Sequence, residues 1–242
     1  MDDRQLQANP VLLRRRDALV AMGAIGLGAG WLASKGSAAI ADLGATENAL
    51  CVLSPELTEG PYWVATHLTR RNVVAGRPGM PLTLRLTIVN ATSCKAIPNA
   101  DVEIWHADAG GVYSAVAGGG GGGTASPTDK TRFLRGHQRS NAAGLVIFDT
   151  IYPGWYPGRT PHIHLKVSVG GDAVHTGQLF FADRVSDSVY RTAPYAARGA
   201  RGGTNASDGI FSQGGSASTL KLAKRATARG YSGAITLGIK AS

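Results

Sequence analysis

Charged residues are scarce in this chain, and the repeats that mark fibrous proteins are absent. Of its 242 residues only 17% are charged, whereas 43% are hydrophobic. A chain with this much apolar sequence can bury a core, which argues against wholesale disorder. Without a collagen period or a heptad repeat, the fibrous classes are excluded. The length fits one folded domain preceded by a short leader.

Basic runs with interleaved aromatic residues are also absent, although the net charge is +9. A basic surface can attract nucleic acid, anionic polymers or small organic anions. Nucleic-acid binding normally gathers Lys and Arg on one face, whereas here they are scattered along the sequence. We therefore expect no nucleic-acid partner.

Only two cysteines are present, Cys51 and Cys94. Neither lies near a histidine in the sequence, which argues against a cysteine nucleophile or a cysteine metal ligand. In an exported chain such a pair is more often a disulfide than two free thiols. We expect a disulfide that closes a loop of 43 residues. The loop-entropy estimate for its contribution to stability is roughly 3–4 kcal/mol.

The first 41 residues are predicted to be an export signal. An arginine cluster at 14–16 is followed by an uncharged stretch, residues 18–34, and then by Ala39-Ile40-Ala41, which matches a cleavage site. The arginines resemble a twin-arginine signal, although Asp17 departs from the bulky apolar residue usual in that region. The alternatives are an ordinary secretory leader and an uncleaved anchor, for which the stretch is weakly apolar. We expect cleavage by residue 42, export to the periplasm or beyond, and no stable membrane association afterwards.

Alternating apolar and polar residues predict strands in residues 42–242, which we expect to form one domain. Residues 82–88 alternate strictly, the mark of a strand with one buried face. Glycine-rich turns separate similar runs, which predicts an all-β fold, either a sandwich or a barrel. The other expected strands are residues 102–105, 145–148, 163–167, 178–181 and 234–237; a short helix is expected within 183–197, and 184–230 as a long irregular connection.

Six consecutive glycines at 118–123 form a low-complexity segment. They lack the strand–glycine–helix context and the lysine of a phosphate-binding loop. We therefore interpret this segment as a flexible loop.

The strongest chemical pattern is His162-Ile163-His164 at the start of an apolar run. In a strand these two histidines point to the same face, about 6–7 Å apart, where they can share a metal ion. On its own the pair is explained equally well by two histidines with ordinary hydrogen-bond partners. Zinc is the common metal for such a pair.

Two tyrosines and an arginine lie near this pair. Tyr156 precedes a proline in a Gly/Pro-rich loop, which holds it extended, and the loop runs directly into the histidines. Tyr113 follows a predicted strand in a turn, and Arg159 stands three residues before His162. Each tyrosine alone is more often a packing residue than a ligand.

Together these segments resemble the intradiol ring-cleavage dioxygenases, over roughly residues 53–239. The resemblance implies a β-sandwich of mostly antiparallel strands with long irregular loops. It also implies a non-haem Fe(III) ion bound by two tyrosines and two histidines. The segments that carry it most specifically are 58–62, 102–107, 111–114 and 153–164. The ligand positions match Tyr113, Tyr156, His162 and His164.

The family's active-site arginine matches Arg159 and its glutamine matches Gln178, so the resemblance implies that Tyr156, Arg159 and Gln178 are catalytic. The implied partners are a catecholic aromatic and O2. Both oxygen atoms would enter between the two hydroxyl-bearing carbons, giving a cis,cis-muconate-type product. Thr160-Pro161 departs from the commoner Pro-Ala. The ring substituents of the substrate and the oligomeric state stay open.

Two other classes of function are weighed against this one. A non-catalytic β-sandwich binding module would not need both tyrosines, both histidines and the arginine. A zinc-binding hydrolase lacks a nearby third ligand and leaves the tyrosines unexplained. Of the remaining residues, His106 is expected to be buried and structural, and Tyr62 either to line the pocket or to serve in packing.

Overall fold

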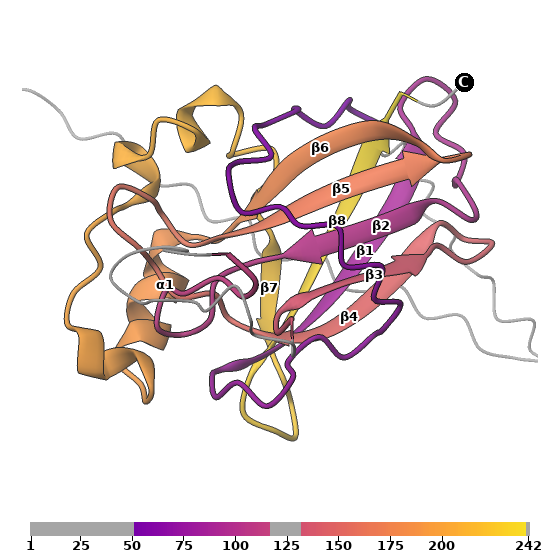
Figure 1. The fold of residues 1–242 in the computed structure, drawn as a ribbon. Helices are drawn as coiled ribbons and strands as arrows, with labels where there is room; N and C mark the ends of the chain where they lie inside the picture. Colours follow the sequence, from indigo (N-terminus) through magenta and orange to yellow (C-terminus); the bar gives the residue numbers. More distant parts are fainter. Residues whose placement is uncertain (1–50, 117–131, 241–242) are drawn as a thin grey trace, which may run out of the picture. The chain divides into compact units, whose positions relative to one another are not determined.

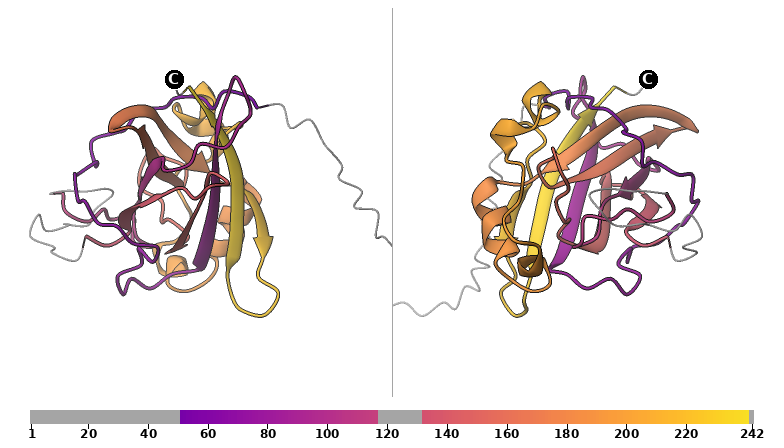
Figure 2. Two further views of the ribbon diagram at one scale, coloured as in Figure 1. Left: turned by 90° about the vertical axis from the view of Figure 1, so that its right-hand side faces the viewer. Right: turned by 60° about the vertical axis from the view of Figure 1, so that its left-hand side comes forward.

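The computed structural model describes residues 51–116 and 132–240, which form two packed four-stranded sheets (Figures 1 and 2). Strands β1 and β8 are parallel, and the other neighbouring strands are antiparallel. The expected all-β sandwich is therefore confirmed. The first sheet has the order β4 (Leu145–Ile151), β1 (Pro81–Asn90), β8 (Tyr231–Ile239), β7 (Lys221–Lys224). The second has the order β3 (Arg135–Arg139), β2 (Asp101–Trp105), β5 (His162–Val169), β6 (Asp172–Phe180).

Strand β1 follows the alternation of its sequence. Leu82 and Leu84 are buried, whereas Arg85 is exposed on the opposite face. The buried side chains join Ile104 and Ile163 of the other sheet in one hydrophobic core. The core therefore lies between the sheets, and the outer face of each sheet takes no part in it.

All six expected strands are present, but two further strands were not predicted. Strand β3 has the sequence Arg-Gly-His-Gln-Arg, which shows no apolar alternation. Strand β7 is short, lysine-rich and mostly exposed. It lies inside the segment 184–230 that was expected to be a long irregular connection, so that expectation was wrong at residues 221–224. Pairing with β8, rather than its own hydrophobicity, holds it in place.

The rest of this connection is irregular, as expected, and begins with the short helix α1 (Asp183–Tyr190). The predicted helical piece thus ends earlier than residue 197. Three 3₁₀ turns follow: η1 (Tyr195–Arg198), η2 (Asn205–Ser207) and η3 (Phe211–Gln213).

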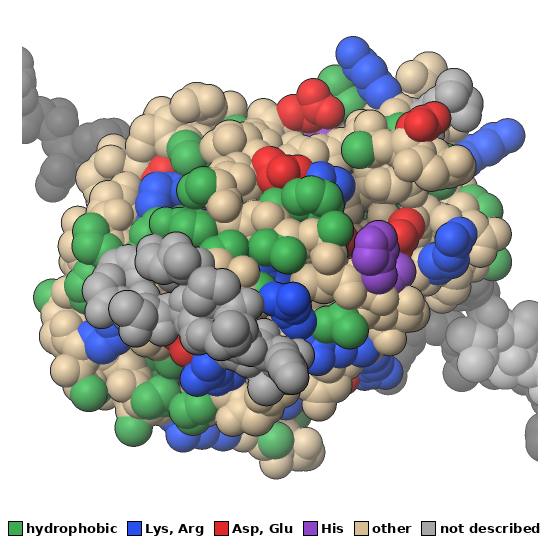
Figure 3. Space-filling model, in the orientation of Figure 1, with side chains coloured by type: hydrophobic (Ala, Val, Ile, Leu, Met, Phe, Trp, Pro, Cys, Tyr) green, Lys and Arg blue, Asp and Glu red, His purple; other side chains and the backbone are tan. Residues whose placement is uncertain are grey.

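The predicted disulfide between Cys51 and Cys94 is present. The proposed export signal and the glycine segment at 118–123 lie outside the described residues. Within the described part of the chain, no helix is long and apolar enough to span a membrane. On the face drawn in Figure 3, Lys and Arg side chains lie in both halves, whereas Asp and Glu side chains lie mainly in the upper half.

Candidate metal centre

The two histidines lie on the outer face of the second sheet, at the beginning of β5. Ile163 and Leu165 point into the core, so His162 and His164 point the opposite way. They are nevertheless only 2% and 1% exposed. The chain that precedes β1, indigo in Figure 1, crosses this face and helps to cover it. A strand buried on both faces with histidines on one of them indicates a site rather than a solvated surface.

Two glycine-rich loops bring the tyrosines to the same place. Tyr113 follows β2 in a turn whose Gly111 has φ +81°, and a Cβ there would lie 2.3 Å from the carbonyl oxygen of Trp155. In the loop before Tyr156, Gly154 donates its backbone N–H to Asp108 O at 3.0 Å. Because neither glycine has a side chain, the two loops contact each other backbone to backbone.

The four side chains converge at their polar atoms. Tyr156 Oη lies 3.0 Å from His162 Nε2, and Tyr113 Oη lies 3.1 Å from His164 Nε2. The two Nε2 atoms are 3.1 Å apart, and Tyr113 Oη is 3.4 Å from His162 Nε2. Two oxygens and two nitrogens thus surround one buried point.

The protonation of these groups suits a bound cation. Burial lowers the pKa of His162 to about 3, and that of His164 well below its usual value, so both imidazoles are neutral. His162 Nδ1 donates to Thr160 O at 2.7 Å, which leaves its Nε2 lone pair facing the tyrosines. Burial raises the pKa of Tyr113 and of Tyr156, with Arg159 acting against it. Phenols in this environment keep their protons unless a cation replaces them.

The donor set discriminates between metals. Phenolate oxygens with two imidazoles suit a hard, highly charged ion such as Fe(III). Within residues 51–116 and 132–240, no group of three or more His, Cys, Asp or Glu side chains could hold a metal ion. A standard zinc site therefore has no counterpart among the described residues. The residues present fit ferric iron.

Arg159 also reaches this point, and Gln178 contacts Arg159. Gln178 lies on β6 directly opposite His164, and its Oε1 accepts from Arg159 Nη2 at 2.5 Å. Its Nε2 donates to Thr58 O at 2.9 Å. Arg159 Nη1 lies 3.4 Å from Tyr156 Oη. All six residues singled out from the sequence are thus brought together.

Two residues left open by the sequence lie beside the centre. Tyr62 is half-buried and stacks on Tyr113, with ring centroids 4.5 Å apart. His106 is buried and structural, as expected: its Nδ1 donates to Ala107 O, and Thr150 Oγ1 lies 2.7 Å from its Nε2. Burial lowers the pKa of His106 to about 4, so it is neutral.

Sequence reasoning missed three residues around the centre. The Trp105 ring stacks on His164, with centroids 5.0 Å apart and an interplanar angle of 6°. Arg135 is 1% exposed and donates to Ser114 O, next to Tyr113. Asp208 pairs with Arg159 at 2.9 Å. Trp105 was visible within a matching segment, but nothing local distinguishes Asp208 from other aspartates in loops.

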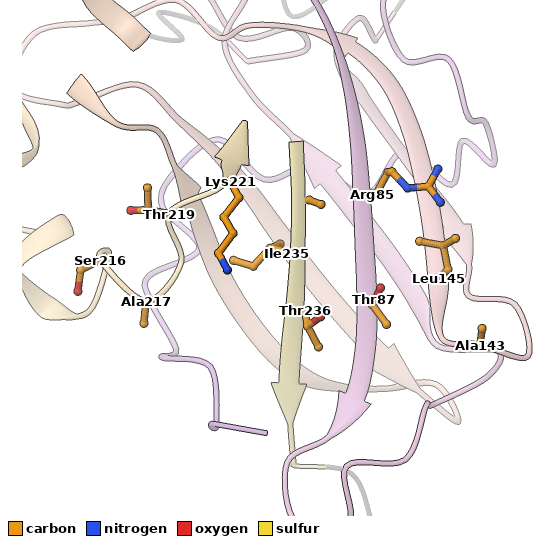
Figure 4. Close-up of a pocket in the computed structure, with 11 residues that line it drawn as sticks. Arg85, Thr87, Ala143, Leu145, Ser216, Ala217, Thr219, Lys221, Ile235 and Thr236 are labelled. Atoms are coloured by element: carbon orange, nitrogen blue, oxygen red, sulfur yellow. The ribbon is translucent and has the colours of Figure 1, made fainter. Parts of the chain in front are cut away.

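Cavity volume alone does not locate this centre. A cavity of about 660 Å³ lies on the outer face of the first sheet, bordered by Arg85 and Lys221 (Figure 4). None of its lining residues is a histidine, a tyrosine or a carboxylate. The chemistry therefore lies on the other sheet.

The fold and the centre together define an all-β protein with a buried donor cluster of two tyrosines and two histidines, and solved structures place it in a family. An intradiol ring-cleavage dioxygenase from Tetranychus urticae is 37% identical, with a TM-score of 0.73, over 78% of this chain and 95% of that one. The dioxygenase domain of a carbohydrate-binding fusion protein from Streptomyces sp. SirexAA-E is 28% identical, with a TM-score of 0.56, over 78% and 99%. The chain belongs to the intradiol ring-cleavage dioxygenases.

More distant structures share the fold. A 3-chlorocatechol 1,2-dioxygenase from Rhodococcus opacus 1CP is 18% identical, with a TM-score of 0.57, over 78% of this chain and 73% of that one. Comparisons with models of protein families and with curated proteins gave no match.

Proposed function

We propose that this protein is an Fe(III)-dependent intradiol dioxygenase that cleaves a catecholic aromatic between its two hydroxyl-bearing carbons, using both atoms of O2. The product is of the cis,cis-muconate type. One observation carries the proposal: two phenol oxygens and two neutral imidazole nitrogens converge in a buried site, where each atom lies 3.0–3.4 Å from at least one of the others.

Tyr113, Tyr156, His162 and His164 would hold the iron. Ferric iron, when bound, supplies a Lewis acid that favours oxygen anions such as a deprotonated catechol. The two tyrosinates supply negative charge, and the two imidazoles complete the set without adding any. The protein's contribution is a dry, preformed cluster in which each donor is already oriented.

Tyr156 is the residue placed to accept a proton from the substrate. Its Oη lies beside Arg159 Nη1, and the positive charge of Arg159 favours the phenolate against the effect of burial. A phenolate oxygen there can take the proton of a catechol hydroxyl, the role of a general base. Arg159 also presents a fixed donor to negative charge that develops on the substrate.

Gln178 orients Arg159. Its amide oxygen accepts from Arg159 Nη2, and its amide nitrogen is held by Thr58 O, so the amide cannot flip without losing both bonds. The Arg159 side chain is thereby prevented from swinging out of the site.

We also propose that the protein is exported, with residues 1–41 removed. The Cys51–Cys94 disulfide supports this, because disulfides persist in oxidising compartments. N-terminal sequencing of protein from the extracellular or periplasmic fraction should find a start near residue 42. An intact Met1 on membrane-bound protein would contradict the proposal.

The activity is tested on purified protein loaded with iron. Tyrosinate–iron charge transfer should give a reddish colour, and oxygen uptake with catechol, hydroxyquinol, protocatechuate or gallate should be accompanied by ring cleavage. Protein loaded with zinc is the matched control and should be colourless and inactive. Colourless iron-loaded protein, or no oxygen uptake with any of the four catechols, would count against the proposal.

A further inference from the structure

The irregular connection between α1 and β7 reaches the candidate centre through one side chain, Asp208. Its carboxylate is completely buried, although it lies in a segment of short turns. Asp208 Oδ2 accepts from Arg159 Nε at 2.9 Å and from the backbone N–H of Thr160 at 2.8 Å. The same segment contacts this strand entry again at Asn205, whose Oδ1 accepts from Thr160 Oγ1 at 2.7 Å.

All four hydrogen bonds to this carboxylate come from N–H donors. Two go to Oδ2, as described, and Oδ1 accepts from the backbone N–H of Ile210 at 2.8 Å and of Phe211 at 3.0 Å. If asparagine replaced Asp208, its NH2 group would face two N–H donors in either orientation of the amide, because each carboxylate oxygen accepts two hydrogen bonds. The site therefore requires an anion. Burial by itself raises the pKa of Asp208, but the hydrogen bonds and Arg159 outweigh it, and the net effect lowers the pKa.

The pairing decides which edge of the guanidinium faces the centre. With Nε bound to Asp208 and Nη2 to Gln178, Nη1 is left beside Tyr156 Oη at 3.4 Å and His162 Nε2 at 3.3 Å. A second branch runs through Thr160, whose N–H bonds Asp208 and whose carbonyl accepts from His162 Nδ1. One carboxylate thus supports both the arginine and a candidate metal ligand.

We propose that Asp208 is a positioning residue of the active site, which holds Arg159 so that Nη1 faces the reacting groups. The inference rests on the proposed function and extends the site to the connection between α1 and β7. This segment is thereby part of the catalytic apparatus rather than a passive link between strands.

The test compares Asp208→Asn, Arg159→Gln and the double variant in iron-loaded protein. Asp208→Asn should lower kcat for catechol roughly 10–100-fold, the usual range for losing a residue that orients a ligand or catalytic group. KM should change less than kcat, because Arg159 acts on charge that develops during the reaction. In the Arg159→Gln background the second substitution should lower kcat much less than it does in the wild-type protein, since the arginine is gone and only the contact through Thr160 remains.

Asp149→Asn is the matched control. Asp149 also pairs with an arginine, Arg71, at 2.8 Å, but on the first sheet away from the centre. It should keep wild-type kcat. A wild-type kcat in Asp208→Asn, or losses that multiply in the double variant, would overturn the inference.

Two readouts do not depend on turnover. A crystal structure of Asp208→Asn should show Arg159 turned away from Tyr156, and the affinity for 4-nitrocatechol, measured by titration, should change less than kcat does. An unmoved Arg159 in that crystal structure would contradict the role proposed for Asp208. Failure of the wild-type protein to cleave any catechol would contradict only the proposed function. Should Asp208→Asn not fold, Arg159→Lys tests the same point. Lysine keeps the charge but cannot reach both Asp208 and the site, so wild-type activity in that variant would overturn the inference.

Discussion

The two outer faces of the sandwich differ sharply. On the second sheet, the face that carries His162 and His164 is covered by loops, and polar groups are buried there. On the first sheet, the equivalent face is open, with Arg85 and Thr236 exposed beside a broad cavity (Figure 4). Both faces carry polar residues, but only the covered one removes them from water.

Burial of polar groups is costly unless every group finds a partner. A fold that buries two imidazoles and two phenols together on one outer face, while leaving the other face bare, has a specific use for the buried set. The comparison therefore locates the chemistry better than cavity size does.

The largest effect should follow from removing a histidine of the covered face. Replacing His162 or His164 with Ala removes one of only two neutral donors, so iron binding should fall to background. Metal analysis of purified variants measures this, with Thr236→Ala on the open face as the control. Full iron occupancy in either histidine variant would remove that residue from the site.

Replacing the two tyrosines should have different effects, one mainly on catalysis and the other mainly on iron content. Tyr156→Phe removes a donor and the proposed base, so it should weaken the visible absorption and slow substrate deprotonation roughly 10²–10⁴-fold. Tyr113→Phe should mainly impair iron retention, because Tyr113 is the more deeply buried of the two, at 0% against 9% exposed. Stopped-flow absorbance with catechol and iron analysis separate the two effects. Wild-type colour and turnover in Tyr156→Phe would contradict the assignment.

A methyl group between the tyrosine loops should reduce stability. In Gly154→Ala the new Cβ would lie 2.3 Å from Asp108 O, so the loops must separate. We expect the free energy of unfolding to fall by about 1–3 kcal/mol, as for other overpacked sites, and iron content to fall with it. Urea unfolding of the metal-free protein gives the first quantity. Gly202→Ala is the control, since its Cβ would be 3.7 Å from Trp155; equal midpoints for the two variants would argue against tight contact between the loops.

The smallest expected effect, that of Arg85→Met, comes from a comparison of two arginines, one buried in the second sheet and one exposed on the first. Arg135 is buried, burial lowers its pKa to about 10, and it donates to Ser114 O. Replacing it with Met leaves that carbonyl without a partner, which should cost about 1–3 kcal/mol. Arg85→Met on the open face should change stability by less than about 0.5 kcal/mol. Thermal unfolding of both variants checks the contrast, and equal shifts would remove the difference between the faces.

The sequence predicted those parts of the fold that local patterns dictate. Residues 82–88 alternate because one face of β1 is buried, and the histidines of β5 were recognisable because their spacing matches a strand. Strands β3 and β7 were missed because their pairing partners, rather than their own side chains, hold them in the sheets.

The candidate site was predictable where its residues are close in sequence. Tyr156, Arg159 and His162 lie within seven residues, in a segment typical of the family. Asp208 follows 49 residues after Arg159, in a segment without periodicity. Only the folded chain reveals that its carboxylate meets four N–H donors, because that information is in the tertiary contacts.

The backbone contact between the tyrosine loops has a consequence for how this protein can change over evolution. Surface loops usually accept insertions and deletions independently of one another. Here the Gly154 N–H donates to Asp108 O, and Gly111 leaves room for Trp155 O. The backbone conformation of each loop therefore depends on that of the other. A change in the length of either loop would displace both tyrosines at once. We therefore expect a length change in one loop to be tolerated only together with a compensating change in the other.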